Sequence, residues 1–227
     1  IMGTIGLSPG DELLAATAVR EQHLIDRGGF VLPPSVASAV PPDPAIAAYA
    51  LRTIPPREQA GNVDIKQLSK GAHLLIPVDT PGGLFSAGDA HFAQGDSETC
   101  GTAIEMGATL HVRFHVRKGE AAEKGIRYPR FTREDYYLSP EFAAPRRFTA
   151  TTGISMTRDG VGYSEDVTLA ARNALLNMID HLGERGWTRQ QAYAICSVAV
   201  DLKLSQVVDV PNMLVSAFLP EDIFTAS

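Results

Sequence analysis

The sequence has few cysteines, no long apolar run and no basic excess, and each of these absences excludes a class of protein. Two cysteines, Cys100 and Cys196, are too few for a disulfide framework and favour a reduced, cytoplasmic setting. No apolar run approaches the ~20 residues of a membrane-spanning helix, so no membrane association is expected. Because 20 Lys and Arg face 26 Asp and Glu, no nucleic-acid partner is expected either.

Nucleotide-binding motifs are also missing. Neither G-x-G-x-x-G nor G-x-x-x-x-G-K-[ST] occurs, so binding of a nucleotide cofactor has no support from a motif. The 227 residues are 44% hydrophobic, which is enough to bury a sizeable core in one large or two small domains.

Short strands dominate the first part of the predicted structure. Residues 1–7 and 73–78 are apolar runs that we expect to form strands, the second of them buried. Residues 107–117 alternate between apolar side chains and His or Arg, which predicts a half-exposed strand. One helix is expected over residues 11–27, where two glycines end it.

Two consecutive helices are expected late in the chain. Ser164 is a candidate cap for the first, which runs to His181 with an apolar stripe along one side. Thr188 caps the second, and Gln191, three residues on, completes a capping box.

The order of these elements favours a mainly β fold with an α+β portion. Strands come before helices instead of alternating with them, which argues against a doubly wound sheet. We expect residues 1–150 to form part of a β-sandwich that carries the acidic glycine-rich loop. Residues 151–227 are expected to form the α+β portion, which packs on that sandwich.

Residues 82–105 concentrate the candidate chemistry. The stretch GGLFSAGDAHFAQGDSETCGTAIE holds four carboxylates, one His, one Cys and five Gly, but few large apolar side chains. Glycine lets the backbone approach neighbours closely or adopt positive φ. Because strand-like runs flank the stretch, we expect a functional site held on a rigid scaffold.

A metal site is the first hypothesis for this stretch. Asp89 and His91 are two residues apart, so in an extended backbone both side chains leave the same face. A carboxylate and an imidazole at this spacing suit a divalent metal such as zinc. Asp64, after a Gly-Asn turn upstream, could reach the same place. An open coordination position would acidify a bound water, with Glu105 as the proton carrier.

Other roles stay open for these and nearby residues. Asp96 and Glu98 repeat the two-residue spacing, although single acidic residues near glycines are commonly solvated turn residues. Lys66 is either an ion-pair partner of Asp64 or a donor that orients substrate. Cys100 is a second candidate as nucleophile, but it would need a nearby base. Its acidic neighbours disfavour a thiolate, so an inert thiol is the preferred interpretation.

Three long strings resemble the acetamidase/formamidase family of amide hydrolases. They are IPPREQAGNVDIKQLSKGAHLLIPV, the stretch at residues 82–105, and residues 153–224. The resemblance implies hydrolysis of short aliphatic amides to a carboxylic acid and ammonia. It also implies a jelly-roll-like β-sandwich with a smaller α+β unit, a divalent metal that is expected to be zinc, and a homo-oligomer.

The resemblance also singles out particular residues. The GNxDxK, GDxHxxQGDxE and GTAIE strings select Asn62, Asp64, Lys66, Asp89, His91, Gln94, Asp96, Glu98 and Glu105. Among these, the predicted metal ligands are Asp64, Asp89, His91 and Glu98. Glu105, Asp96 and Lys66 are predicted to be catalytic, and Asn62 and Gln94 to bind the amide substrate.

The chain departs from the family pattern in two ways. Ser97 stands where GDGE is commoner, a small change at a turn. Family members usually carry further strands ahead of the first strand seen here, so we expect a second chain or an N-terminal segment to complete the sandwich. Two alternatives to a metal-dependent amidase remain: an amidase with Cys100 as nucleophile, and a non-enzymatic module whose acidic loop holds a metal.

Overall fold

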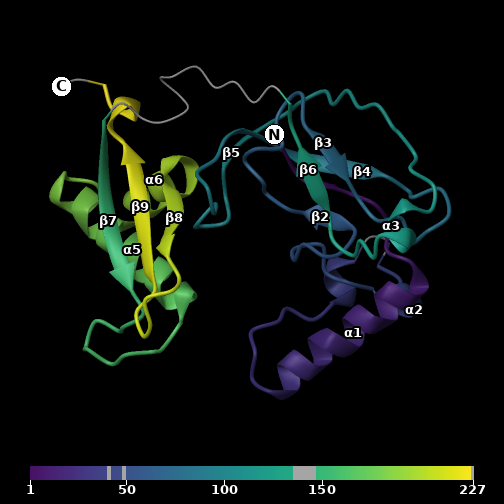
Figure 1. Ribbon diagram of the computed structural model, residues 1–227, viewed down its shortest axis with the longest axis horizontal. Helices are drawn as coiled ribbons and strands as arrows, with labels where there is room; N and C mark the ends of the chain where they lie inside the picture. Colours follow the sequence, from purple (N-terminus) through teal and green to yellow (C-terminus); the bar gives the residue numbers. More distant parts are fainter. Residues whose placement is uncertain (40–41, 48–49, 135–146, 226–227) are drawn as a thin grey trace.

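The computed structural model describes residues 1–39, 42–47, 50–134 and 147–225 and shows two groups of elements side by side (Figure 1). We call β1 to β6 the N-terminal group and β7 to η2 the C-terminal group. Every strand pair in the described part is antiparallel, and helices accompany the sheets. This mixture of antiparallel sheets and helices agrees with the predicted mainly β fold with an α+β portion, while the jelly-roll arrangement and the division after residue 150 stay predictions.

The main sheet of the N-terminal group has the order β2-β1-β4-β5. Its strands are β1 (Met2–Gly6), β2 (Ala60–Asn62), β4 (Ser86–Ala93) and β5 (Ile104–Met106). The predicted first strand is confirmed as β1, which lies between β2 and β4. This order brings the segment after β2 close to the acidic glycine-rich stretch.

Smaller elements surround this sheet. The expected first helix is confirmed as α1 (Asp11–Asp26), and β3 (His73–Leu75) pairs with β6 (Arg130–Thr132). The remaining elements are η1 (Val36–Ser38), α2 (Pro44–Ala47) and α3 (Glu120–Glu123).

The C-terminal group is a three-stranded sheet with two helices. The sheet has the order β7-β9-β8, formed by β7 (Phe148–Ile154), β8 (Asp201–Gln206) and β9 (Leu214–Pro220). The helices are α5 (Val167–Glu184) and α6 (Arg189–Ala199), and η2 (Glu221–Ile223) follows β9. Both predicted late helices are therefore confirmed.

The caps and the core explain why this group folds as it does. The predicted capping box of Thr188 and Gln191 is present at α6. The cap of α5 is Asp166, whose carboxylate accepts the Leu169 N–H at 2.8 Å. The predicted cap, Ser164, was therefore wrong, because the helix begins after Asp166. Apolar side chains of α5, α6 and β9, together with Val200, form the buried core, and Leu202 of β8 packs against it.

Two predicted strands differ from the structure. Residues 107–117 form no strand, and Phe114 and Val116 are 65% and 80% exposed. A strand needs a neighbour for its N–H and C=O groups, and these residues pair with no strand in the described part of the chain. The strand predicted at residues 73–78 ends at Leu75, and Val78 is 59% exposed instead of buried.

None of the described helices combines the length and the apolar character that crossing a membrane would require.

Candidate functional site

Strand pairing brings four predicted site residues to one end of the main sheet. His91 and Glu105 are direct partners across β4 and β5, and their side chains approach to 3.2 Å. Asp89 lies two residues before His91, and its carboxylate is also 3.2 Å from the His91 Nε2 atom. Asp64 follows β2 and completes the group of Asp64, Asp89 and His91, whose ligand atoms lie within 4.8 Å of one another.

A second group shares the same imidazole. His91, Glu98 and Glu105 also place their ligand atoms within 4.8 Å of one another. The sequence-based cluster is thus assembled around His91, the only member that is almost fully buried, at 2% exposed. The predicted proximity of Asp89 and His91 is confirmed.

Hydrogen bonds fix the tautomer of His91. The Gln94 Nε2 atom donates to the Asp64 carbonyl at 2.7 Å, so the Gln94 Oε1 atom faces His91 Nδ1 as an acceptor, at 2.8 Å. Nδ1 must therefore carry the proton in a neutral ring, and the lone pair lies on Nε2. This bonding fixes which ring atom faces the carboxylates.

The Nε2 atom of His91 is the unusual atom of the site. It is buried and has no hydrogen-bond partner in the part of the chain that the structure describes, although two carboxylate oxygens lie 3.2 Å away. A lone pair that faces two carboxylates is repelled unless a proton or a cation lies between them.

Asp64 presents a second unsatisfied atom beside a tightly packed glycine. Its Oδ1 atom is buried and has no hydrogen-bond partner among the described residues. A Cβ atom on Gly3 of β1 would lie 2.6 Å from this oxygen, 2.6 Å from Asp89 Oδ2 and 2.7 Å from His91 Cε1. Only glycine at this position leaves room for the three side chains to converge.

The backbone is strained where the site carries its carboxylates. Asp64, Asp89 and Glu98 have φ values of 44°, 59° and 42°, in the left-handed region that costs non-glycine residues energy. Three such residues in one cluster indicate that the surrounding structure holds these carboxylates in place.

Protonation equilibria reflect this crowding. Burial, followed by the nearby Asp89 charge, raises the pKa of Asp64, and burial, followed by Asp64, raises the pKa of Glu98. Burial of the His91 ring opposes its charged form, but Gln94 and the neighbouring carboxylates outweigh burial and raise the pKa of His91. A cation would relieve the same repulsion that these protons relieve.

The donor set therefore fits a divalent metal. One imidazole nitrogen with its other nitrogen held by Gln94, together with several carboxylate oxygens, matches the ligands of zinc and related ions. Among the described residues, His91 Nε2 and Asp64 Oδ1 have no hydrogen-bond partner, and both residues belong to a group whose ligand atoms lie within 4.8 Å of one another.

Four other predicted site residues have protein partners. Asn62 accepts from Thr4 Oγ1 and donates to the Ile54 carbonyl, at 2.8 and 3.1 Å. The amide of Gln94 is shared between His91 and Asp64, which favours an orienting role over the predicted substrate contact.

Lys66 and Asp96 meet at one carboxylate that the sequence did not single out. The Lys66 Nζ atom and the Asp96 N–H both donate to Asp201 Oδ1, at 2.6 and 2.9 Å. Asp96 also accepts from Gln67 Nε2 at 3.0 Å. Asp201 has no distinguishing local pattern, because its importance comes from contacts with residues far away in the sequence.

The two cysteines occupy different surroundings. Cys196 is fully buried in the C-terminal core, and burial raises the pKa of its thiol to about 12. Cys100 is partly exposed, and its backbone N–H donates to Ser197 Oγ at 3.0 Å.

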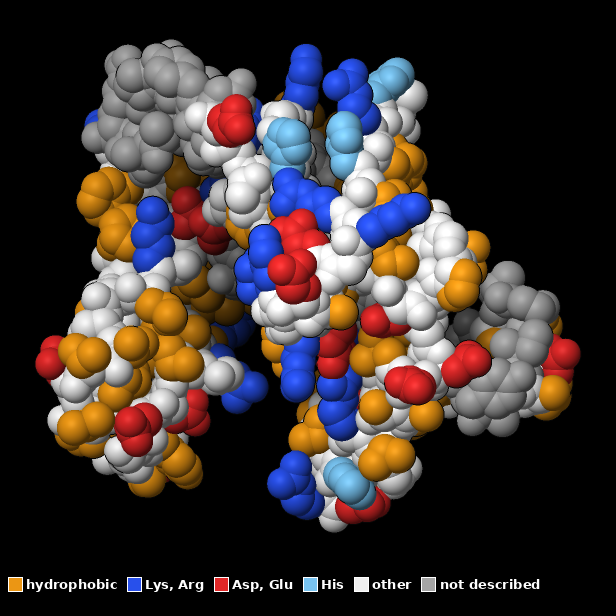
Figure 2. All heavy atoms as spheres, turned by 45° about the vertical axis from the view of Figure 1, so that its right-hand side comes forward, with side chains coloured by type: hydrophobic (Ala, Val, Ile, Leu, Met, Phe, Trp, Pro, Cys, Tyr) orange, Lys and Arg blue, Asp and Glu red, His pale blue; other side chains and the backbone are white. Residues whose placement is uncertain are grey.

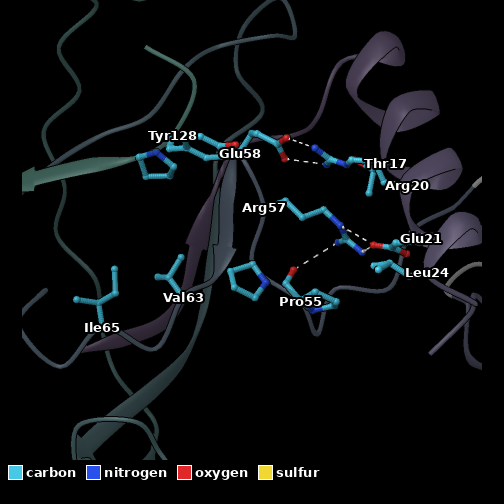
Figure 3. A pocket seen from close by; sticks show the side chains of 12 residues that line it. Thr17, Arg20, Glu21, Leu24, Pro55, Arg57, Glu58, Val63, Ile65 and Tyr128 are labelled. Carbon is cyan, nitrogen blue, oxygen red and sulfur yellow. Dashed lines mark hydrogen bonds and ion pairs between the residues drawn. The ribbon is translucent and has the colours of Figure 1, made fainter. Parts of the chain in front are cut away.

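A separate surface pocket lies between α1 and residues 55–58, 63 and 65 (Figure 3). Its charged walls are paired with one another, Arg20 with Glu58 and Arg57 with Glu21. Because none of the clustered side chains lines it, we place the candidate site at the cluster and not at this pocket.

Comparisons with known proteins found a family model and relatives that match most of the chain. A family model described as the Acetamidase/Formamidase family matches residues 1–226. The chain is 38% identical over 236 residues to formamidase of Methylophilus methylotrophus, covering 98% of this chain and 56% of the formamidase. It is 36% identical over 209 residues to acetamidase of Mycolicibacterium smegmatis, covering 85% of this chain and 50% of the acetamidase.

A solved structure shares the fold. The gamma lactamase from Delftia acidovorans matches with a TM-score of 0.87 and 35% identity, covering 100% of this chain and 57% of the lactamase. The chain thus spans about half the length of the proteins that it matches.

Proposed function

The chain belongs to the acetamidase/formamidase family, and from that premise we propose that it hydrolyses short-chain aliphatic amides, of the formamide and acetamide type, to a carboxylate and ammonia. The observation that carries the proposal is the buried Nε2 lone pair of His91, which faces the carboxylates of Asp89 and Glu105. A cation at this place would relieve the repulsion between the lone pair and the carboxylates.

We propose zinc as that cation, held by Asp64, Asp89 and His91, with Glu98 as a further ligand from the second group. An imidazole nitrogen favours zinc over calcium, which prefers oxygen ligands alone. Zinc held by these residues would supply Lewis-acid chemistry toward an amide carbonyl and water.

Glu105 is placed to move protons. Its Oε1 atom accepts the Ala103 N–H at 3.1 Å, which anchors the carboxylate, while Oε2 faces His91 Nε2. The side chain is 49% exposed, so water and a small amide can reach it. Glu105 takes a proton from the attacking water and delivers it to the departing nitrogen, which leaves as ammonia.

Gln94 supports the site without touching the substrate. By accepting from His91 Nδ1 and donating to the Asp64 carbonyl, it orients one ligand and fixes the backbone of another. The neutral imidazole is held with Nε2 toward the carboxylates, and the strained backbone of Asp64 is held in place.

Metal content and ammonia release, measured on one sample, test this function. We expect ammonia from formamide or acetamide, loss of release after chelation, and recovery when Zn²⁺ is returned. Full activity in a sample shown to be free of metal would refute the metal mechanism. A metal-loaded protein that releases ammonia from no short amide, and opens no lactam, would refute the activity.

We also propose that further polypeptide covers part of this chain. The chain exposes 14807 Å² at 24.3 kDa, whereas a compact monomer of that mass exposes about 10,000 Å². Hydrophobic side chains are spread widely over the face in Figure 2. The excess exceeds the 1,200–2,000 Å² that a standard interface typically buries, which supports a completing segment, a second chain or a homo-oligomer.

Residues 107–117 are the proposed place for part of this contact. Their alternating pattern suits a strand, and their apolar side chains are exposed in the single chain. A completing polypeptide would pair with this segment and extend the sheets toward the predicted jelly-roll-like sandwich. A cytoplasmic location is proposed from the cysteine content alone. Light scattering and intact mass would show which polypeptides are present, and a compact isolated monomer would refute this proposal.

A further inference from the structure

The loop that carries Glu98 belongs to the N-terminal group but is held by the C-terminal group. Residues 95–102 leave the end of β4 and lie against α6 and the start of β8. The Gly95 N–H donates to the Ser197 carbonyl at 3.0 Å, and the Leu202 N–H donates to the Asp96 carbonyl at 3.3 Å. Backbone bonds thus cross from one group to the other where the loop begins.

Ser197 contacts this loop at three places. Besides its carbonyl bond to Gly95, its Oγ atom accepts the Cys100 N–H at 3.0 Å and donates to the Thr102 carbonyl at 2.7 Å. The residue is fully buried, so these bonds are shielded from water. One serine therefore ties the loop on both sides of Glu98.

The approach is too close for any other residue at the start of the loop. A Cβ atom on Gly95 would lie 2.3 Å from the Val200 carbonyl oxygen and 3.1 Å from that of Cys196. Between the tied ends, Ser97 and Glu98 have φ values of 98° and 42°. A strained backbone persists only where its surroundings hold it, and here the last turn of α6 supplies the constraint.

We propose that Ser197 is a positioning residue for Glu98, which it holds in the metal-binding arrangement by fixing the 95–102 loop. The inference rests on the proposed metal function, because Glu98 must be a ligand for its position to matter. Ser197 touches neither substrate nor metal ligand atoms; it acts through the backbone bonds at Gly95, Cys100 and Thr102. The site is then shared between the two groups, with the C-terminal group setting one ligand.

A matched pair of serine variants tests this role. Ser155 is also fully buried, and its Oγ atom accepts the Met213 N–H at 3.1 Å and donates to the Asp166 carbonyl at 3.0 Å, within the C-terminal group only. Ser197→Ala and Ser155→Ala should both lower the melting temperature. Only Ser197→Ala should weaken zinc affinity, by about 10-fold or more, as measured by competition with a chromophoric chelator.

A double-mutant cycle with Glu98→Ala then separates positioning from general damage. If Ser197 acts through Glu98, Ser197→Ala costs no further zinc affinity in the Glu98→Ala background. An additive loss, or equal zinc affinities for the two serine variants, overturns the positioning role. A wild-type protein that takes up no zinc, or any other divalent metal, overturns the metal proposal and this inference together.

A milder variant covers the case in which Ser197→Ala does not fold. The Tyr193 hydroxyl donates to the Thr99 carbonyl of the same loop at 2.6 Å, and the residue is 39% exposed. Tyr193→Phe removes this one bond without opening the core. We expect a smaller loss of zinc affinity that again disappears in the Glu98→Ala background, and an unchanged affinity would count against the inference.

Discussion

Replacement of Gly3 by alanine tests the site more sharply than replacement of any ligand. The new methyl group would lie 2.6 Å from carboxylate oxygens of Asp64 and Asp89, where ordinary contact begins at 3.4 Å. Each oxygen would have to move by about 0.8 Å, whereas metal–ligand distances tolerate about 0.2 Å. No polar or titratable group is removed, so the effect comes from geometry alone.

We expect Gly3→Ala to weaken zinc binding by about 100-fold and to destabilise the metal-free protein by about 1–3 kcal/mol through overpacking. Chelator competition measures the first quantity, and denaturant unfolding in EDTA measures the second. Gly88→Ala is the control, because it also lies in the β1–β4 pair and a Cβ there meets nothing within 4 Å. If both variants bind zinc like the wild type, the site does not form at this place.

Three further substitutions test the roles of Cys100, Gln94 and Glu221. Cys100→Ser should leave ammonia release near normal, and loss of turnover with zinc still bound would favour the nucleophile alternative. Gln94→Leu should lower zinc affinity by about 10-fold by freeing His91 Nδ1, and a raised KM with unchanged zinc affinity would instead favour substrate contact. Glu221 has its pKa lowered from 4.5, first by the Thr149 hydroxyl and then by Arg185, so its stabilisation is present above pH 4.5 and is lost as pH falls. Glu221→Gln should therefore reduce the unfolding free energy by about 1 kcal/mol at pH 7 and by much less at pH 3, and an equal loss at both would contradict this.

Local patterns were sufficient where the cause of structure is local. The first helix, the two late helices and the capping box of Thr188 follow from periodicity and capping chemistry, which depend on residues a few positions apart. The pairing of Asp89 with His91 is local in the same sense, because the two lie in one strand.

Sequence patterns gave wrong predictions where the structure depends on another part of the chain. Residues 107–117 have the alternation of a strand, but alternation describes only the faces of a strand and cannot supply a neighbour for its backbone. Ser164 has the side chain of a helix cap, but the chain turns two residues later and Asp166 caps α5 instead. In both cases the local preference is real, and the arrangement of the neighbouring chain decides the outcome.

The sequence by itself determined the family, the first helix, the two late helices and the set of acidic residues around His91. Only the tertiary structure decided which of them meet, because strand order places Gly3 against Asp64 and Asp89, and cross-strand pairing places Glu105 against His91. Likewise, only the packing of the C-terminal group shows that Asp201 holds Lys66 and that Ser197 holds the loop of Glu98. The contacts of Asp201 with Lys66 and of Ser197 with the loop join residues about 100 or more positions apart. No local pattern records a contact over that separation.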